Sequence, residues 1–400
     1  MIPELLAPAG SIESLQTAFH FGADSVYMGS RYSLRATNNQ TAELERLARA
    51  VAITRELGKK IYITVNAFVY QHDLADLAVY LQEVAALQPD AIIVSDPAVI
   101  RLARERFPSI DLHLSTQANT LNASAVRFWL DQGIRRLVLG RELTILQLMD
   151  IRRQVPDAEL EIFIHGALCL AFSGRCFLSH YLSGRSANQG RCSHPCRWNY
   201  TLREPKRDRD VMCIETSNGP TALLAPFDLM SLELLPELCA LGMDAFKIEG
   251  RMKGSFYTGM VVHCYRKNLD RLARGLAIDR QDIDRLRYVT RRGYNTGFLS
   301  GKDSDHSHRE YAPMEDVHAF IGIVDSVHTE GEKTFAKVRL RNKIHIQERV
   351  EILSPTGESM QFVSEMVTEE GSIDCGQPNQ VVWFVWPDVR ISAHDILYRV

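Results

Sequence analysis

The sequence has no run of about 18 apolar residues, so we expect no transmembrane helix. Its start, Met1–Pro8, has neither the basic segment nor the apolar segment of a secretory signal peptide, which predicts a cytoplasmic protein. It also lacks G-x-G-x-x-G and G-K-[ST], the glycine-rich motifs that hold nucleotide phosphates. The hydrolase motifs H-E-x-x-H and G-x-S-x-G are missing as well, which argues against a peptidase.

Lysine is scarce: the chain has 10 lysines against 36 arginines, and its formal net charge is −3. That balance excludes a uniformly polybasic nucleic-acid binder. Arginine carries a planar fork that suits phosphates and carboxylates, but a GC-rich genome would raise its count too. The positions of the arginines must therefore decide between these explanations.

Short apolar runs alternate with helix-period segments over the first 270 or so residues. This alternation predicts a parallel sheet, and eight such units favour a (β/α)8 TIM-like barrel over a doubly wound open sheet. The expected strands are Glu4–Ala7, Ser25–Met28, Ile61–Val65, Ala91–Val94, Leu112–Ser115, Arg136–Leu139, Glu161–Ile164 and Ala245–Ile248.

We expect a barrel domain over 1–300, a linker over 301–315 and a small all-β barrel domain over 316–400. Strands seven and eight of the first barrel are separated by about 80 residues instead of the usual 20 to 30. The intervening segment, 165–245, is therefore predicted to be a long Cys-rich insertion. In a barrel it would emerge at the C-terminal face, where active sites are built.

Four of the eight cysteines crowd into this insertion, at Cys169, Cys176, Cys192 and Cys196. Four thiolates in one loop can hold zinc or an iron–sulfur cluster. Structural zinc usually uses knuckles of Cys-x2–4-Cys, so the six-residue gap after Cys169 leans towards a cluster. Spacing alone leaves both metals open.

The insertion is also strongly basic, with five arginines and no acidic residue between Cys169 and Arg203. Part of this charge would offset a thiolate-ligated cluster. The rest, interleaved with aromatic residues, suits a phosphate backbone and stacked bases. The predicted RNA-binding residues are Arg175, Arg185, Arg191, Arg197, Trp198 and Tyr200.

Polar residues alternate with apolar ones along the predicted strands and continue beyond their C-terminal ends. If the apolar parity faces the helices, the polar parity lines the mouth of the barrel. Because unpaired buried charges are costly, Lys247 and Glu249 must pair with each other, with neighbours or with a ligand. Lys247, Arg251 and Arg141 together could hold a small polycarboxylate, and the same parity adds Asn66 and Gln117.

The segments Glu161–Ser179, Ser186–Trp198 and Lys247–Arg251 together resemble the signature of peptidase family U-32, the collagenase-like proteases. Tyr32–Arg35, His113–Asn119, Gly140–Leu143 and Arg292–Phe298 extend the resemblance, and within the family the prephenate-dependent tRNA hydroxylases are the most similar branch.

This resemblance implies an enzyme that forms 5-hydroxyuridine at the wobble position of tRNA, with a 4Fe–4S cluster and prephenate as the dicarboxylate co-substrate. Arg35 joins the substrate-binding residues, and His165, Lys247 and Glu249 are the catalytic candidates. Three alternatives stay open: a hydroxylase of 23S rRNA cytidine, a collagenase-like peptidase, and a non-catalytic RNA-binding scaffold with structural zinc.

Overall fold

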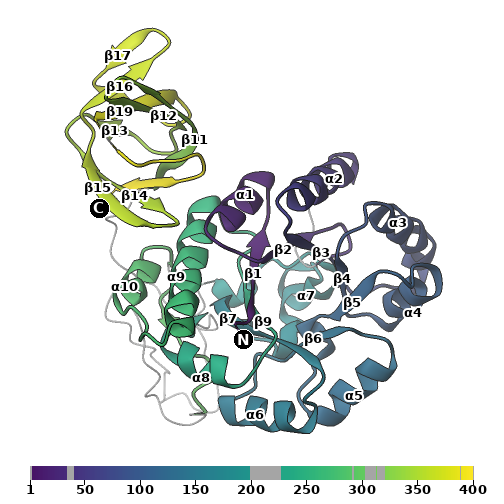
Figure 1. The fold of residues 1–400 in the computed structure, drawn as a ribbon. Coiled ribbons are helices and arrows are strands. Elements are labelled where there is room, and N and C mark those ends of the chain that lie inside the picture. The colour runs from purple at the N-terminus through teal and green to yellow at the C-terminus, as the bar shows by residue number, and fades with distance from the viewer. Residues whose placement is uncertain are drawn as a thin grey trace, which may run out of the picture.

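Eight parallel strands close into a barrel in this computed structural model (Figure 1). Its strands are β1 (Glu4–Ala9), β2 (Ser25–Gly29), β3 (Lys60–Val65), β4 (Ala91–Val94), β5 (Asp111–Leu114), β6 (Arg136–Val138), β7 (Glu159–Ala167) and β9 (Ala245–Ile248). Strand β9 pairs in parallel with both β1 and β7, so the sheet closes. The predicted barrel is therefore confirmed, and the open sheet is excluded. The structure describes residues 2–33, 40–198, 227–290, 292–301, 312, 320–387 and 389–399.

Helices surround the barrel and cover the apolar parity of its strands. They are α1 (Ile12–His20), α2 (Gln40–Glu56), α3 (Leu74–Ala86), α4 (Pro97–Arg106), α5 (Ala123–Asp131), α6 (Ile145–Gln154), α8 (Leu235–Ala240) and α9 (Ser255–Ala273), followed by α10 (Gln281–Arg287). Ser11, Asp96, Asn122 and Thr144 begin α1, α4, α5 and α6 by accepting a hydrogen bond from a backbone N–H. Among the described helices, none has the length and apolar content needed to cross a membrane.

The Cys-rich insertion leaves the barrel at the C-terminal end of β7, as predicted. Its described elements are η3 (Phe172–Gly174), α7 (Leu178–Ser183), η4 (Ala187–Gln189), η5 (Pro195–Arg197) and β8 (Asp228–Met230). Strand β8 returns antiparallel to the end of β7, and β10 (Tyr294–Asn295) pairs with β8. The remainder of the predicted range, η7 (Leu232–Leu234) and α8, leads back into the barrel.

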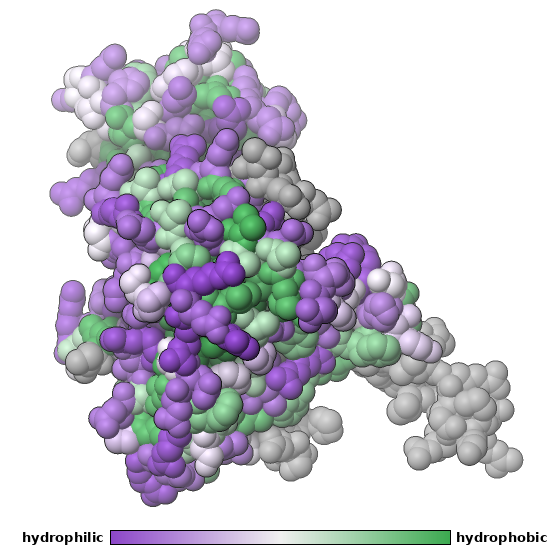
Figure 2. Space-filling view, turned by 90° about the vertical axis from the view of Figure 1, so that its right-hand side faces the viewer, coloured by the Kyte–Doolittle hydropathy of each residue, from purple (hydrophilic) through white to green (hydrophobic). Residues whose placement is uncertain are grey.

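The C-terminal region is antiparallel and all-β, as predicted, and stands above the barrel in Figures 1 and 2. Its strands are β11 (Phe320–Glu330), β12 (Lys333–Arg339), β13 (Ile344–His345), β14 (Arg349–Ser354), β15 (Gly357–Phe362), β16 (Glu365–Thr368), β17 (Gly371–Ile373), β18 (Cys375–Gly376), β19 (Val381–Pro387) and β20 (Ile396–Arg399). Its large sheet runs from β15 to β17, and in the described ranges no pairing joins these two edge strands. The predicted linker over 301–315 lies mostly outside the described residues.

The C-terminal region packs against α1 and α9. Phe256 of α9 stacks on Phe320 of β11, with ring centroids 5.2 Å apart. Arg341 donates to Glu13 of α1 at 2.8 Å. The two parts therefore share a contact surface beside the C-terminal face of the barrel (Figure 1).

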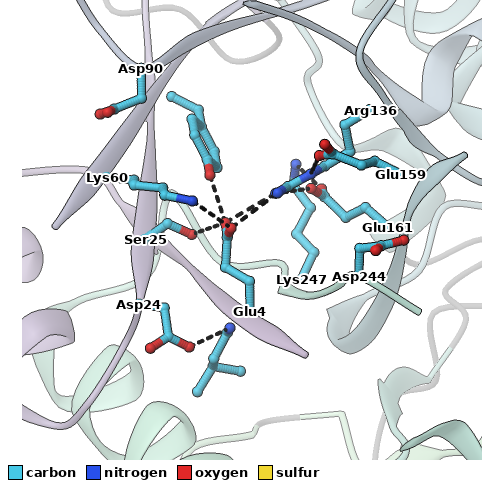
Figure 3. Close-up of polar contacts among 12 residues, drawn as sticks. Glu4, Asp24, Ser25, Lys60, Asp90, Arg136, Glu159, Glu161, Asp244 and Lys247 are labelled. Carbon is cyan, nitrogen blue, oxygen red and sulfur yellow. Dashed lines mark hydrogen bonds and ion pairs between the residues drawn. The ribbon is translucent and has the colours of Figure 1, made fainter. Parts of the chain in front are cut away.

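A network of charged side chains fills the barrel interior at the amino ends of the strands (Figure 3). The guanidinium of Arg136 donates to both carboxylate oxygens of Glu4 at 3.0 Å, and Ser25 and Tyr62 donate to the same carboxylate. Burial alone would raise the pKa of Glu4, but Arg136 and the two hydroxyls outweigh it and lower the pKa to about 2. Glu4 therefore stays ionised inside the barrel.

The lowered pKa of Glu4 predicts a specific loss of stability in acid. Between about pH 4.5 and 2, Glu4 is protonated in the unfolded chain but still ionised in the folded one. The stabilisation that the ionised Glu4 gives above this window is therefore lost within it. Chemical unfolding of wild type and Glu4→Gln from about pH 6 to pH 3 should show their difference in unfolding free energy shrinking by about 2 kcal/mol. A difference that is constant with pH would contradict the assignment.

Candidate functional site

A cavity of about 150 Å³ opens at the carboxyl ends of the barrel strands, under the Cys-rich insertion. Side chains from opposite sides of the barrel and from the insertion converge on it. Of the residues predicted from the sequence, those lining it are Asn66, Gln117, Arg141, Cys169, Cys176, Cys192, Cys196, Arg197, Lys247, Glu249 and Arg251. The structure thus brings most of the predicted site into one enclosed space.

Lys247 supplies a buried positive charge at the floor of this cavity. Its ammonium donates to Glu161 at 2.8 Å and lies 4.5 Å from the centre of the Tyr27 ring. Burial lowers the pKa of Lys247, and the ion pair with Glu161 opposes this shift only in part. Glu161 is the partner that the sequence analysis missed. Counting the alternation along β7 would have found it, because Glu161 and Phe163 share the parity that faces the interior.

Two arginines add positive charge at the sides of the cavity. Arg141 stacks over the Phe163 ring at 3.9 Å, and within the described ranges no carboxylate forms an ion pair with it. Arg251 is fixed in place, because it donates to Thr64 at 2.7 Å and to Ser33 at 3.1 Å. A Cβ at Gly29 would lie 2.5 Å from this guanidinium, so the side chain requires glycine there.

Glu249 is held by its backbone at the edge of the cavity. Its N–H donates to the carbonyl of His165 at 2.8 Å, and its carbonyl accepts from Tyr257 at 2.7 Å. Gly166 makes this contact possible, since its φ is +102° and a Cβ there would lie 2.2 Å from the Glu249 carbonyl oxygen. The carboxylate is therefore carried by a rigid segment.

Two amide side chains face the same space. Asn66 donates to Ser115 at 3.1 Å. Gln117 is only 1% exposed, and neither its Oε1 nor its Nε2 has a hydrogen-bond partner in the described residues. An unsatisfied buried amide costs about 1–3 kcal/mol, so Gln117 is suited to a polar ligand that enters the cavity.

The four cysteines of the insertion are free thiols that all line the cavity. Hydrogen bonds within the insertion position them: the backbone of Cys176 exchanges two with the Asn188 amide, at 3.1 and 3.2 Å. Ser179 is buried and bonds both the carbonyl of Arg185 and the Ser193 hydroxyl. The segment that carries the thiols is thus tied together without a disulfide between them.

The thiols are close enough to influence each other. Burial raises the pKa of Cys196, Arg197 opposes this shift, and the other three cysteines add to it. In the described residues no three Cys, His, Asp or Glu side chains are drawn together as tightly as a bound metal ion requires. Four soft sulfur donors around one cavity nevertheless fit the donor set of an iron–sulfur cluster.

The predicted RNA-binding residues that the structure describes lie on the Cys-rich insertion. Arg175 donates to the Gln117 carbonyl at 3.2 Å, Arg197 lines the cavity, and Arg185 and Arg191 are exposed on the insertion. Trp198 is 42% exposed. Tyr200, like Arg35, lies outside the described residues.

Exposed aromatic side chains are more numerous on the insertion than the sequence analysis recognised. Phe172 is 55% exposed, Phe177 70% and Tyr181 74%. Large apolar residues among Gly, Ser and Arg, without helical or strand periodicity, are the signal that could have marked the two phenylalanines. Of these, Phe177 and Tyr181 are neighbours, with ring centroids 6.3 Å apart. Exposed aromatic rings such as these are suited to stacking on bases.

His165 is not brought to the cavity. It is fully buried, and its ring nitrogens lie 3.3 Å from the Tyr265 hydroxyl and 3.2 Å from that of Tyr294. Burial lowers the pKa of His165 to about 3, and the charge of Lys253 adds to this effect. The ring is therefore neutral and packed among tyrosines, on the side of β7 that faces away from the ligand space.

This fold and site define a closed parallel β/α barrel with a thiol-rich insertion over its mouth. The family model described as peptidase family U32 matches residues 10–309, and that of the peptidase family U32 C-terminal domain matches residues 316–397. The chain belongs to peptidase family U32.

Curated relatives resemble the chain over most of its length. The tRNA hydroxylation protein P of Haemophilus influenzae is 37% identical, covering 89% of this chain and 86% of the relative. Its Escherichia coli counterpart is 35% identical, covering 99% and 96%. Other relatives carry other names: a collagenase of Porphyromonas gingivalis is 31% identical over 99% of this chain and 97% of its own length. The 23S rRNA 5-hydroxycytidine C2501 synthase of E. coli is 36% identical over 67% of this chain and 39% of its own.

Proposed function

We propose that this protein is an RNA hydroxylase that converts the wobble uridine of tRNA to 5-hydroxyuridine, with prephenate as co-substrate and a 4Fe–4S cluster as cofactor. One observation carries the proposal: four thiols, four cations and an unsatisfied amide line the same cavity at the C-terminal face of a barrel. Relatives named as tRNA hydroxylation proteins, alike over most of both chains, support the RNA substrate.

Cys169, Cys176, Cys192 and Cys196 are the residues that would hold the cluster. When bound, a 4Fe–4S cluster ligated by four cysteines would supply one-electron transfer. The arginines beside the thiols have a separate role in this scheme. Arg197 lines the cavity next to Cys196 and would offset the negative charge of thiolate ligands.

Arg141, Lys247 and Arg251 suit a small dicarboxylate. An arginine fork can bind a carboxylate through two parallel hydrogen bonds, while the ammonium acts as a point charge. The ammonium of Lys247 has three N–H donors, and one of them binds Glu161. The other two N–H groups can bind a ligand. The flat face of the Arg141 guanidinium lies on the Phe163 ring, so the N–H groups at its edge can donate to a carboxylate.

Gln117 and Asn66 suit the base. The Watson–Crick edge of uracil alternates acceptor, donor and acceptor, and a carboxamide can pair with one donor and one acceptor of that edge. Glu249 lines the cavity and is the candidate for proton transfer at the base. His165 has no part in this scheme.

Arg141→Gln is expected to impair catalysis with little effect on folding. The substitution removes a cation without a carboxylate partner in the described ranges, so the unfolding free energy should change by less than about 0.5 kcal/mol. A lost charge-assisted hydrogen bond costs about 1.5–3 kcal/mol, which corresponds to a KM for prephenate raised roughly 10- to 100-fold.

The test is mass spectrometry of tRNA nucleosides from cells that lack the protein. Wild type should restore 5-hydroxyuridine-type nucleosides, Arg141→Gln should not at normal prephenate levels, and the matched control Arg153→Gln on the exposed end of α6 should restore them fully. An unchanged nucleoside profile in the deletion strain would remove the tRNA assignment.

Two other activities have their own tests. The relative that acts on 23S rRNA favours an rRNA substrate as the second candidate. In that case the deletion would deplete 5-hydroxycytidine in rRNA and leave tRNA unaltered. The relative named collagenase makes peptide hydrolysis the third candidate, to be assayed on denatured collagen with the purified chain.

A further inference from the structure

A second cavity, of about 430 Å³, lies where the barrel meets the C-terminal region. It is bounded by the loops that precede α1 and α9, by Arg46 of α2, and by Phe320 and Arg341 of the C-terminal region. Neither the thiols nor the amides of the first cavity reach it. It therefore needs an explanation of its own.

The lining of this second cavity is predominantly cationic. Arg46, Arg251, Lys253 and Arg341 contribute to it, and among the described lining residues Glu13 is the one carboxylate. Glu13 is occupied, because one oxygen accepts from Ser255 at 2.7 Å and the other from Arg341 at 2.8 Å. An excess of positive charge thus remains in a recess that a ligand can enter.

Arg46 is anchored without being neutralised. Its guanidinium donates to the carbonyl of Gly10 at 3.2 Å and to that of Gly29 at 3.0 Å. Carbonyl oxygens orient the side chain, and unlike a carboxylate they carry no net charge to cancel it. A phosphate oxygen is the natural complement of a guanidinium held in this way.

The start of α9 adds backbone donors to the same recess. Its N-cap is Gly254, which offers no side-chain acceptor to the first helical amides. These amides and the positive end of a 19-residue helix favour an anion. The cations and the helix end together make a site for an oxyanion such as phosphate.

The second cavity adjoins the first, because Arg251 lines both. We propose that the second cavity binds a backbone phosphate of the RNA, beside the nucleotide whose base enters the first cavity. The inference rests on the proposed function and adds to it a place for the substrate backbone, at the junction of the two parts of the chain. A free phosphate ion has the same chemistry, so the experiment must separate the two sources.

The first test is tRNA binding by the full chain, followed by fluorescence anisotropy at about 50 and 200 mM salt. The variant Arg46→Gln/Arg341→Gln should bind more weakly, and its affinity ratio between the two salt concentrations should shrink about threefold for each phosphate that is no longer neutralised. Arg153→Gln, which removes one positive charge at the opposite end of the barrel, is the control for loss of charge and should bind like wild type.

A second variant separates lost binding from lost folding. A Cβ at Gly254 meets nothing within 4 Å, and its backbone is extended, so Gly254→Asp is tolerated. Aspartate is a favoured N-cap, so thermal stability should be kept or rise, while its charge should reduce tRNA affinity roughly tenfold. The neutral Gly254→Asn, which caps equally well, should lose less affinity.

The outcomes decide between the two sources of phosphate. Unchanged tRNA affinity in both Arg46→Gln/Arg341→Gln and Gly254→Asp would overturn the inference. Calorimetry with inorganic phosphate tests for a site that binds the free ion. If Gly254→Asp abolishes phosphate binding but leaves tRNA affinity intact, the cavity is a free-anion site and the inference is also overturned. Because these assays measure binding, a chain that binds tRNA here yet forms no 5-hydroxyuridine would contradict the proposed function alone.

Discussion

Alanine at Cys169, Cys176, Cys192 or Cys196 is expected to abolish the iron–sulfur cluster and, with it, the formation of 5-hydroxyuridine. All four thiols line one cavity, so each is placed to be a ligand of the same cluster. Loss of a single ligand should convert or release a four-iron cluster. This is the largest effect on cofactor content that the structure predicts.

The measurement is made on protein purified without oxygen. Wild type should be brown, with broad absorbance near ~400 nm and matching amounts of iron and sulfide, while each variant should lose most of both. Cys239→Ala, on α8 and outside the cavity lining, is the matched control and should keep the colour. Stoichiometric zinc without iron in the wild type would defeat the assignment and favour a structural site.

Lys247→Ala is expected to remove activity and to destabilise the barrel. The substitution leaves Glu161 fully buried with only Arg136, at 3.6 Å, to balance its charge. Breaking a buried ion pair from one side costs about 3–5 kcal/mol, and the remaining contact to Arg136 places the loss near the lower end. Chemical unfolding and the nucleoside assay measure the two effects separately.

A paired variant distinguishes a structural lysine from one that binds substrate. Lys247→Met with Glu161→Gln removes both charges and keeps similar volumes, so stability should return to within about 1 kcal/mol of wild type. If Lys247 holds a carboxylate of the substrate, hydroxylation stays lost in this variant. Recovery of activity along with stability would show that Lys247 serves the fold alone.

The barrel could be predicted because its strands alternate with helices of regular period. Each of its eight parallel strands, β1 to β7 and β9, overlaps a predicted one, since a short apolar run between two helix-period segments has few other interpretations. The short strands β13, β16, β17, β18 and β20 were not predicted. They have two to four residues each, and no helix-period segments flank them as they do the short strands of the barrel.

The residues of the candidate site could be predicted where polar and apolar side chains alternate regularly along a strand. This alternation placed Asn66, Gln117 and Lys247 on the inward parity, and all three line the cavity. It failed at His165, which continues the parity of Phe163 but is turned away from the cavity. The pairing of β7 with β9 shifts register between those two residues, and the sequence gives no sign of such a shift.

The ionic filling of the barrel interior gives its two layers different responses to temperature. Burying apolar surface makes the heat capacity of unfolding larger, while burying polar surface makes it smaller. The outer layer, between strands and helices, is almost wholly apolar and weakens on cooling. The inner layer adds ion pairs among Glu4, Arg136, Glu161 and Lys247, and the stabilisation from these pairs does not depend on apolar hydration. Cooling should therefore loosen the helices around the barrel before it loosens the floor of the site.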